Sequence, residues 1–198
     1  EIKIAYTLRD ALFNPYKFKQ TFDVRKIISR ETVQKAGVPM LFVELESGQN
    51  GALAKYPSKG YGITWLGADG ATLTLEKGII IASRGMGNDV MGGHTNIPSW
   101  KEILNEANYT RNMSHLIQDN KIQVMNFDCK IKKDNKKKSI KILDVKFVTS
   151  LFIEICKRPN LTIKNLFYVD KKNMVRRSIQ YHSEKIGYIL TERLDLQT

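Results

Sequence analysis

Seven lysines form the densest concentration of charge in the chain: Lys130, Lys132, Lys133, Lys136, Lys137, Lys138 and Lys141. Flexible ammonium groups suit diffuse contact with phosphate or carboxylate groups. Near a membrane each contributes about 1 kcal/mol of attraction to anionic lipid. An alternative is a solvated hairpin tip at residues 134–138, whose lysines discourage edge-to-edge aggregation. The run is therefore a candidate patch for an anionic ligand or a membrane surface.

Three aromatic residues, Trp65, Tyr168 and Tyr181, have flat rings that could stack on sugars, although burial in the core of a sheet is the alternative. Glu44 and Glu46 alternate along one expected strand and would share a face. Two carboxylates on one face can hydrolyse glycosides at the right separation, but ordinary solvated strand residues fit the same pattern. The aromatic residues are therefore candidates for glycan stacking.

The remaining reactive residue types follow no recognised catalytic or metal-binding pattern. His94, His115 and His182 are scattered, and the cysteines lack a CxxC spacing, which argues against zinc. No GxSxG or HExxH motif occurs. The glycine-rich residues 85–93 lack the Lys-Ser/Thr ending of a phosphate-binding loop and predict an irregular connection. We therefore expect no enzyme activity, no catalytic residue, no metal and no cofactor.

The two cysteines, Cys129 and Cys156, could form one disulfide in an oxidising compartment. A hairpin tip at residues 134–138 argues against this pairing, because it places Cys129 opposite Ile142. Cys156 would then lie about 14 residues further along, or about 45 Å away in a straight strand. The sequence leaves the pairing open.

Composition is typical of a soluble globular protein, with 42% hydrophobic and 26% charged residues among 198. No apolar run approaches the 18 to 20 residues, roughly, of a membrane helix. The formal net charge of +12 favours anionic partners, although solubility explains it equally. The chain begins at Glu1 rather than Met, so we expect a processed or trimmed form.

Alternating apolar residues and turn signals predict mostly strands. Asp69-Gly70 predicts a type I′ turn, and Gly78 a second reversal, within a meander over residues 65–85. Further strands are expected at 40–45, 52–56, 121–133, 140–156, 161–170, 174–182 and 186–193. Short helices are expected at 8–13, at 29–37 with Ser29 as N-cap and Gly37 at the C-terminus, and at 99–108 behind a capping box.

These elements predict a mainly β protein in which two antiparallel meander lobes form a sandwich or a partly open barrel, with a few short helices. The lobes cover approximately residues 1–97 and 98–198 of a single domain. Residues 78–83 and 173–178 share a pattern of a turn residue, two apolar residues, two others and a serine. This weak match suggests an internal repeat.

Three stretches carry a resemblance to a known family: Gly-Val-Pro-Met-Leu-Phe-Val at 37–43, Ile-Thr-Trp-Leu-Gly-Ala-Asp-Gly at 63–70 with its continuation to 90, and Asn-Leu-Phe-Tyr-Val-Asp at 165–170 followed by Val-Arg-Arg-Ser-Ile-Gln-Tyr at 175–181. Over about residues 33–194 the chain resembles the YjbF/GfcB family of bacterial lipoproteins, which are encoded with exopolysaccharide and group 4 capsule loci. It departs from the family at Tyr168 and Tyr181, where members often have tryptophan.

The resemblance implies a non-enzymatic accessory protein of the periplasm that assists the production or secretion of exopolysaccharide or capsule. Its partner would be polysaccharide or a protein of the export machinery. It also implies tethering to the outer membrane by a lipid on a cysteine preceding Glu1. A basic nucleic-acid-binding module is the alternative from charge alone. No RNA-recognition signature or recognition helix supports it, so we expect no specific nucleic acid. A polysaccharide-modifying enzyme is a third reading.

Overall fold

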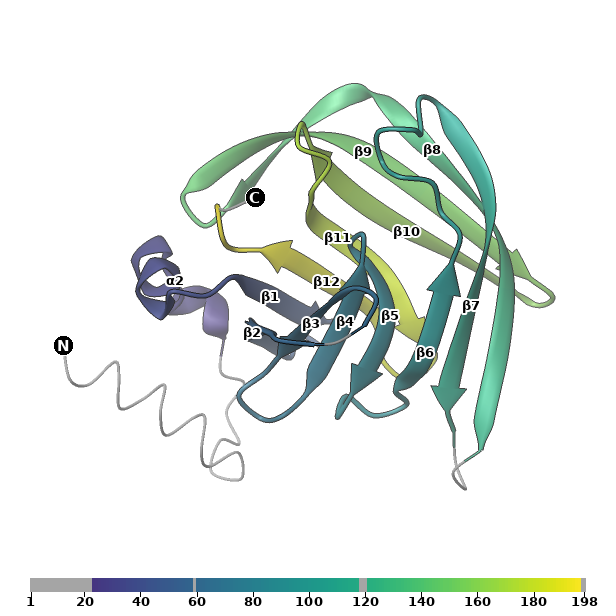
Figure 1. Ribbon diagram of the computed structural model, residues 1–198, viewed down its shortest axis with the longest axis horizontal. Helices are drawn as coiled ribbons and strands as arrows, with labels where there is room; N and C mark the ends of the chain where they lie inside the picture. The colour runs from purple at the N-terminus through teal and green to yellow at the C-terminus, as the bar shows by residue number, and fades with distance from the viewer. Residues whose placement is uncertain (1–22, 59, 118–120, 197–198) are drawn as a thin grey trace.

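The computed structural model describes residues 23–58, 60–117 and 121–196, and this part of the chain forms one antiparallel sheet of twelve strands. The strand order is β5-β4-β3-β2-β1-β12-β11-β10-β9-β8-β7-β6. The sheet curls until β5 and β6 lie side by side, as Figure 1 shows. Of the two predicted arrangements, the partly open barrel is therefore the one formed.

The elements, in chain order, are η2 (Val24–Lys26), α2 (Arg30–Ala36), β1 (Met40–Leu45), β2 (Asn50–Tyr56), β3 (Ile63–Leu66), β4 (Thr72–Glu76), β5 (Ile79–Arg84), β6 (Val90–Thr95), β7 (Glu106–Leu116), β8 (Ile122–Ile142), β9 (Val145–Arg158), β10 (Leu161–Asp170), β11 (Val175–Ser183) and β12 (Gly187–Arg193). Within the described residues, no helix has the length and apolar character needed to cross a membrane.

The predicted helix at 29–37 is confirmed, whereas the one at 99–108 is wrong. The Ser29 side chain accepts a hydrogen bond from the Thr32 N–H, and Gly37 ends the helix with a φ of +67°. At 99–108 the Ser99 N–H donates to Glu102 in a single turn, and β7 then begins. Pairing with β8 overrides the local capping signal there. The predicted helix at 8–13 lies outside the described residues.

The first meander has its expected reversals, but the type I′ turn is not at Asp69-Gly70. Gly70 has a φ of +84°, but Asp69 is not in the positive-φ region, and its side chain accepts from the Ala71 N–H. Positive φ at two successive residues occurs instead at Lys77 and Gly78, with values of 50° and 85°. That pair is the two-residue hairpin turn between β4 and β5.

The predicted hairpin tip at residues 134–138 is wrong, and the predicted strand at 140–156 is divided by a turn at residues 143 and 144 into the end of β8 and most of β9. Strand β8 continues to Ile142, and the chain reverses at residues 143 and 144, where Leu143 has a φ of +53°. The lysine-rich segment is a bulge, where the register with β9 shifts between Lys133 and Lys137. Polar residues are common in both bulges and turns, which explains why the sequence predicted a turn where the structure has a bulge. Of the glycine-rich stretch, residues 85–89 are irregular as predicted and 90–93 belong to β6.

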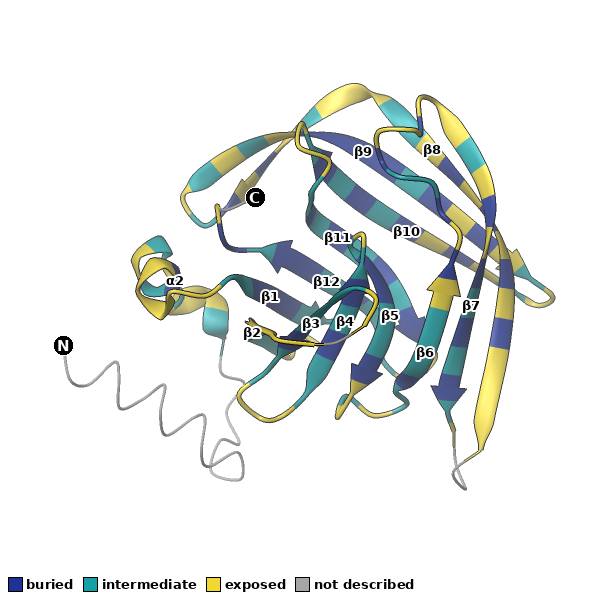
Figure 2. Cartoon of the chain, in the orientation of Figure 1, coloured by how far each residue is buried: buried dark blue, intermediate teal, exposed yellow. Residues whose placement is uncertain are grey.

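Buried residues alternate with more exposed ones along strands such as β7, β8 and β10 (Figure 2). One inner cluster gathers around Trp100, Phe152 and Phe167, and a second lies around Trp65 and Ile189. A third cluster lies between α2 and the sheet and is formed by Val33, Phe42, Ile140, Ile142 and Leu194. It joins α2 to the far end of the β8–β9 hairpin, which arches over the barrel in Figure 1.

Side chains, rather than a backbone ladder, close the seam between β5 and β6 in the described chain. The Arg84 guanidinium donates to the carbonyls of Val90 and Met91 at 2.9 and 3.0 Å. From β7, Arg111 Nη2 donates to the Ile80 carbonyl at 3.1 Å. The seam therefore depends on a few long cationic side chains to satisfy its backbone acceptors.

Candidate functional site

All seven candidate lysines lie on β8, the longest strand of the sheet. Lys130 and Lys141 lie opposite Ile155 and Lys146, which are nine residues apart on β9, or about 30 Å of extended strand. Lys130, Lys132, Lys136, Lys137 and Lys141 are exposed, and the other two are half-buried. We call the seven residues the lysine stripe. Its length suits an extended polymer better than a compact ligand.

The stripe is only partly neutralised by its neighbours. Lys130 pairs with Glu106 at 2.8 Å, and Lys138 pairs with Asp134 at 3.2 Å. The hydrogen bond from Lys130 lowers the pKa of Glu106. Within the described part of the chain, the other five lysines make no ion pair; of these, Lys137 donates to the Ser150 hydroxyl at 2.9 Å. Most of the positive charge is therefore free to meet an anion.

An aliphatic row lies beside Lys130 and Lys132, at one end of the stripe, on the outer face of the sheet. Lys132 faces Ile153 across the β8–β9 ladder, and the same row continues through β10, β11 and β12. We call its half-buried members the aliphatic band: Ile153, Leu166, Ile179 and Leu190. One row further along, Lys130 faces Ile155, which is 40% exposed. This end of the stripe thus borders an apolar surface.

The structure separates the three aromatic candidates. Trp65 is 2% exposed and faces inward, with the Arg193 guanidinium 5.7 Å from its ring centroid, so it offers no surface for stacking. Tyr168 is half-buried on β10, where the Arg177 guanidinium lies 5.9 Å from its ring centroid. Tyr181 is also half-buried and makes an edge contact with Tyr188 at 5.7 Å. Only the two tyrosines remain candidates for contact with a glycan.

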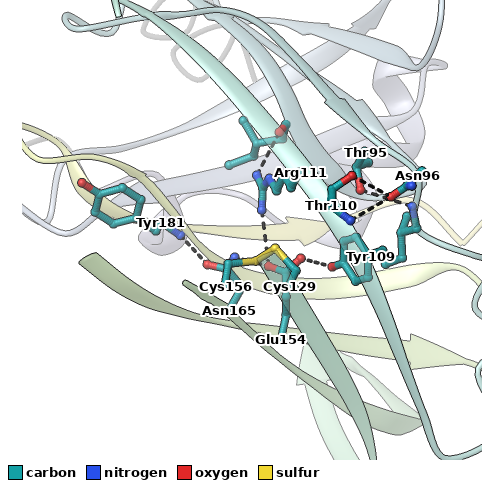
Figure 3. The surroundings of a disulfide bond; sticks show 12 residues. Thr95, Asn96, Tyr109, Thr110, Arg111, Cys129, Glu154, Cys156, Asn165 and Tyr181 are labelled. Atoms are coloured by element: carbon teal, nitrogen blue, oxygen red, sulfur yellow. Dashed lines mark hydrogen bonds and ion pairs between the residues drawn. A yellow bond between two sulfur atoms is a disulfide. The ribbon is translucent and has the colours of Figure 1, made fainter. Parts of the chain in front are cut away.

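Cys129 and Cys156 form a disulfide between β8 and β9, with their Cα atoms 4.0 Å apart (Figure 3). The geometric argument against this pairing was wrong because it rested on the misplaced hairpin tip. With the reversal at residues 143 and 144 and the bulge taking up extra residues, Cys129 lies directly opposite Cys156. The bridge therefore joins neighbouring strands without any bend in β9.

A buried polar network surrounds this disulfide, and sequence reasoning missed it. The Glu154 carboxylate accepts from the Tyr109 hydroxyl, from the Asn165 amide and, at 3.3 Å, from Arg111 (Figure 3). Burial, followed by the charge of Glu154, raises the pKa of Tyr109. The sequence feature that could have indicated this network is Glu154, an acidic residue within the mostly apolar strand β9. Because its partners satisfy the carboxylate, the network supports the fold rather than presenting a reactive group.

The same acid lies within the one group of three potential metal ligands in the described chain: Cys129, Glu154 and Cys156. The two sulfur atoms of this group are bonded to each other. The disulfide therefore uses the two soft ligands that zinc or copper would need.

A serine, a histidine and an aspartate meet at the β5–β6 seam, but not in the order that catalysis needs. Ser83 Oγ donates to Asp89 at 2.9 Å and lies 2.9 Å from His182 Nε2. In a catalytic triad the carboxylate orients the histidine, whereas here it binds the serine. Burial, followed by His115, lowers the pKa of His182 to about 4. These residues hold the loop at 85–89 against the barrel.

The other histidines and the two glutamates are placed apart from one another. His115 is buried, 6.1 Å from His182 between ring centroids, whereas His94 is exposed on β6. Glu44 pairs with Arg25 at 3.2 Å, and Glu46 accepts from the Tyr188 N–H at 2.8 Å. Both carboxylates thus serve as acceptors within the fold.

Comparison with known proteins identifies a family and a similar solved structure. The model of a family described as group 4 capsule polysaccharide lipoprotein (GfcB, YjbF) matches residues 5–194. The crystal structure of the hypothetical lipoprotein YmcC from Escherichia coli K12 superposes with a TM-score of 0.76 and 17% sequence identity, covering 97% of this chain and 95% of that one. At this identity the likeness shows the fold alone. No curated protein matches.

Proposed function

Since the chain belongs to the YjbF/GfcB family of group 4 capsule polysaccharide lipoproteins, we propose that it is a non-catalytic accessory protein for polysaccharide secretion. In this proposal it works in the periplasm, tethered to the outer membrane by an N-terminal lipid. It binds an acidic polysaccharide directly through the lysine stripe. A protein of the export machinery is a second partner, which the aliphatic band would contact.

The lysine stripe is the observation that carries this proposal. Its charges follow one strand for about 30 Å, and Lys132, Lys136 and Lys141 make no ion pair within the described residues. A chain of carboxylated sugars can contact such charges in series, each through solvent-exposed attraction of modest strength. Tyr168 lies on the outer face with Lys130 and Lys132, where it adds a sugar contact in this proposal.

Two further features support the compartment and the absence of catalysis. A disulfide between β8 and β9 suits an oxidising compartment such as the periplasm. The described groups that most resemble catalytic machinery are engaged with one another inside the barrel, namely Glu154 with Arg111 and His182 with Ser83. Both features are consistent with a binding protein.

A matched pair of variants tests the binding surface. In the first, Lys130, Lys132, Lys136 and Lys141 become glutamine. In the control, four exposed lysines on other elements become glutamine: Lys55, Lys101, Lys171 and Lys185. Each variant removes four positive charges from a chain of formal net charge +12. Only the first should lose affinity for a polyuronate such as alginate, with neutral dextran as the reference polymer.

Two further measurements, a salt series and a comparison with single-stranded oligonucleotides, distinguish the possible outcomes of this experiment. Binding to the polyuronate should weaken as salt rises above about 0.1 M, where exposed charges are screened beyond about 10 Å. Equal losses in both variants would mean that net charge, not the stripe, attracts the polymer, and would contradict the proposal. Tighter binding to single-stranded oligonucleotides than to the polyuronate would favour the nucleic-acid alternative instead.

A further inference from the structure

A cavity of about 280 Å³ opens at one end of the barrel, on the inner side of the sheet. It lies where the β4–β5 turn meets the β10–β11 turn, beside the inner cluster that contains Trp65. Its lining includes Leu41, Ile63, Trp65, Lys77, Lys172 and Met174. We call it the end cavity.

The walls of the end cavity are mainly apolar, and its charges are all positive. Its described lining includes no acidic residue, while Lys77, Lys172 and Arg193 are cationic. Lys77 Nζ donates to the Ile97 carbonyl at 3.0 Å rather than to a carboxylate. Arg193 is paired with Asp195, at 3.0 Å. Lys77 and Lys172 are exposed, and neither makes an ion pair within the described residues, so their ammonium groups place positive charge at the opening of an apolar chamber.

An unused hydrogen-bond donor lies in the wall of the same cavity. Trp65 is 2% exposed, and its indole Nε1 has no hydrogen-bond partner within the described residues. Buried indole N–H groups usually find an acceptor. In contrast, Nε1 of Trp100, the other tryptophan, donates to the Lys77 carbonyl at 2.9 Å. The wall of the cavity therefore holds one buried polar group that the described residues leave unpaired.

The two turns at the opening are packed against each other. A Cβ atom added to Gly78 would lie 2.5 Å from a methyl group of Val175, so the β4–β5 turn rests on the start of β11. Lys77, the residue before this glycine, and Lys172, in the facing turn, are thereby held on the two sides of the opening. Because the turns support each other, the cavity is pre-formed.

We propose that the end cavity binds an amphipathic anion, with an apolar chain among Leu41, Ile63 and Met174 and a phosphate or carboxylate head at Lys77 and Lys172. The volume lies at the lower limit of ligand sites, which suits a single hydrocarbon segment. A sugar ring fits less well, because the apolar walls leave its hydroxyls unpaired. This ligand is distinct from the polymer assigned to the lysine stripe.

Calorimetric titration of the full chain with dodecyl phosphate, laurate and uncharged dodecyl maltoside tests the proposal. Both anions should bind saturably and the neutral detergent should not. Lys172→Glu should weaken the anions by about tenfold, equivalent to about 1.4 kcal/mol. Lys171→Glu is the matched control, because Lys171 is exposed in the same turn and does not line the cavity, and it should change affinity less than about twofold.

Two further measurements locate the ligand. Met174→Trp should fill the chamber and abolish binding, with a thermal melt confirming that the variant is folded. Ligand should change the tryptophan fluorescence of the native chain but not that of Trp65→Phe, which keeps Trp100. Equal binding of the neutral detergent, equal effects of the two lysine variants, or no saturable binding would overturn the proposal. The tighter of the two anions identifies the head group.

Discussion

Removing the Arg111 guanidinium should destabilise the barrel strongly, because it leaves the Glu154 carboxylate buried beside the disulfide without its cation. The two side chains are 1% and 0% exposed, and Arg111 also satisfies the Ile80 carbonyl across the β5–β6 seam. Breaking a buried pair from one side costs about 3–5 kcal/mol. We therefore expect Arg111→Met to lower the free energy of unfolding by that amount.

Urea denaturation followed by circular dichroism measures this loss. With a slope of about 2–3 kcal/mol per molar for a small protein, the midpoint should fall by about 1–2.5 M. Lys130→Met removes the cation from the exposed pair with Glu106 and serves as the control, with an expected loss of less than about 1 kcal/mol. The double variant Arg111→Met, Glu154→Leu should recover part of the stability, because it removes both buried charges.

Two outcomes would refute this reasoning about the buried network. The first is a loss for Arg111→Met no larger than that for Lys130→Met. The second is a double variant as unstable as the sum of the two single variants, because independent contributions would show that the two charges do not interact.

Three further predictions concern other parts of the fold. Replacing Cys129 and Cys156 with serine should cost about 3–4 kcal/mol in urea unfolding, from the 27-residue separation that the bridge spans; an unchanged midpoint would contradict this. The pKa of His182 is lowered to about 4 in the folded protein, so the unfolded chain binds a proton at this residue more readily. The free energy of unfolding should therefore fall by up to about 3 kcal/mol as the pH drops from 6.5 to 4. His182→Gln should make this dependence on pH weaker, and an unchanged dependence would exclude this histidine as the cause. Gly78→Ala should lower the free energy of unfolding by about 1–3 kcal/mol more than Gly48→Ala, as measured by thermal or urea unfolding. Both glycines have a φ near +85°, but only at Gly78 does the added Cβ meet a neighbouring atom, at 2.5 Å. Equal losses of stability in the two variants would mean that backbone strain is the whole effect.

Local signals in the sequence predicted the elements that depend on a few neighbouring residues. The helix from Ser29 to Gly37 was found because both capping residues lie within it. The reversal at Leu143 was missed because neither residue of that turn is glycine, proline or asparagine, while the bulge near Lys136 has the polar composition of a turn. One misplaced reversal then produced the wrong cysteine geometry.

The candidate site was predictable in composition but not in arrangement. The lysine stripe was visible as a charge cluster, yet its extended form depends on β8 continuing through the bulge. The end cavity joins Trp65 of β3 with Lys172 and Arg193, which are remote in sequence. Similarly, Glu154 meets Arg111 only because β7, β8 and β9 are neighbours in the sheet. Such contacts follow from strand order, which local patterns do not encode.

The most direct test of the proposed function compares the polyuronate affinities of the two quadruple lysine variants at low salt. We predict that glutamine at Lys130, Lys132, Lys136 and Lys141 weakens binding by about tenfold, or about 1.4 kcal/mol. The control at Lys55, Lys101, Lys171 and Lys185 should stay within about twofold of the native chain. Equal weakening in the two variants, or no binding by the native protein, would contradict the assignment of the polymer to β8.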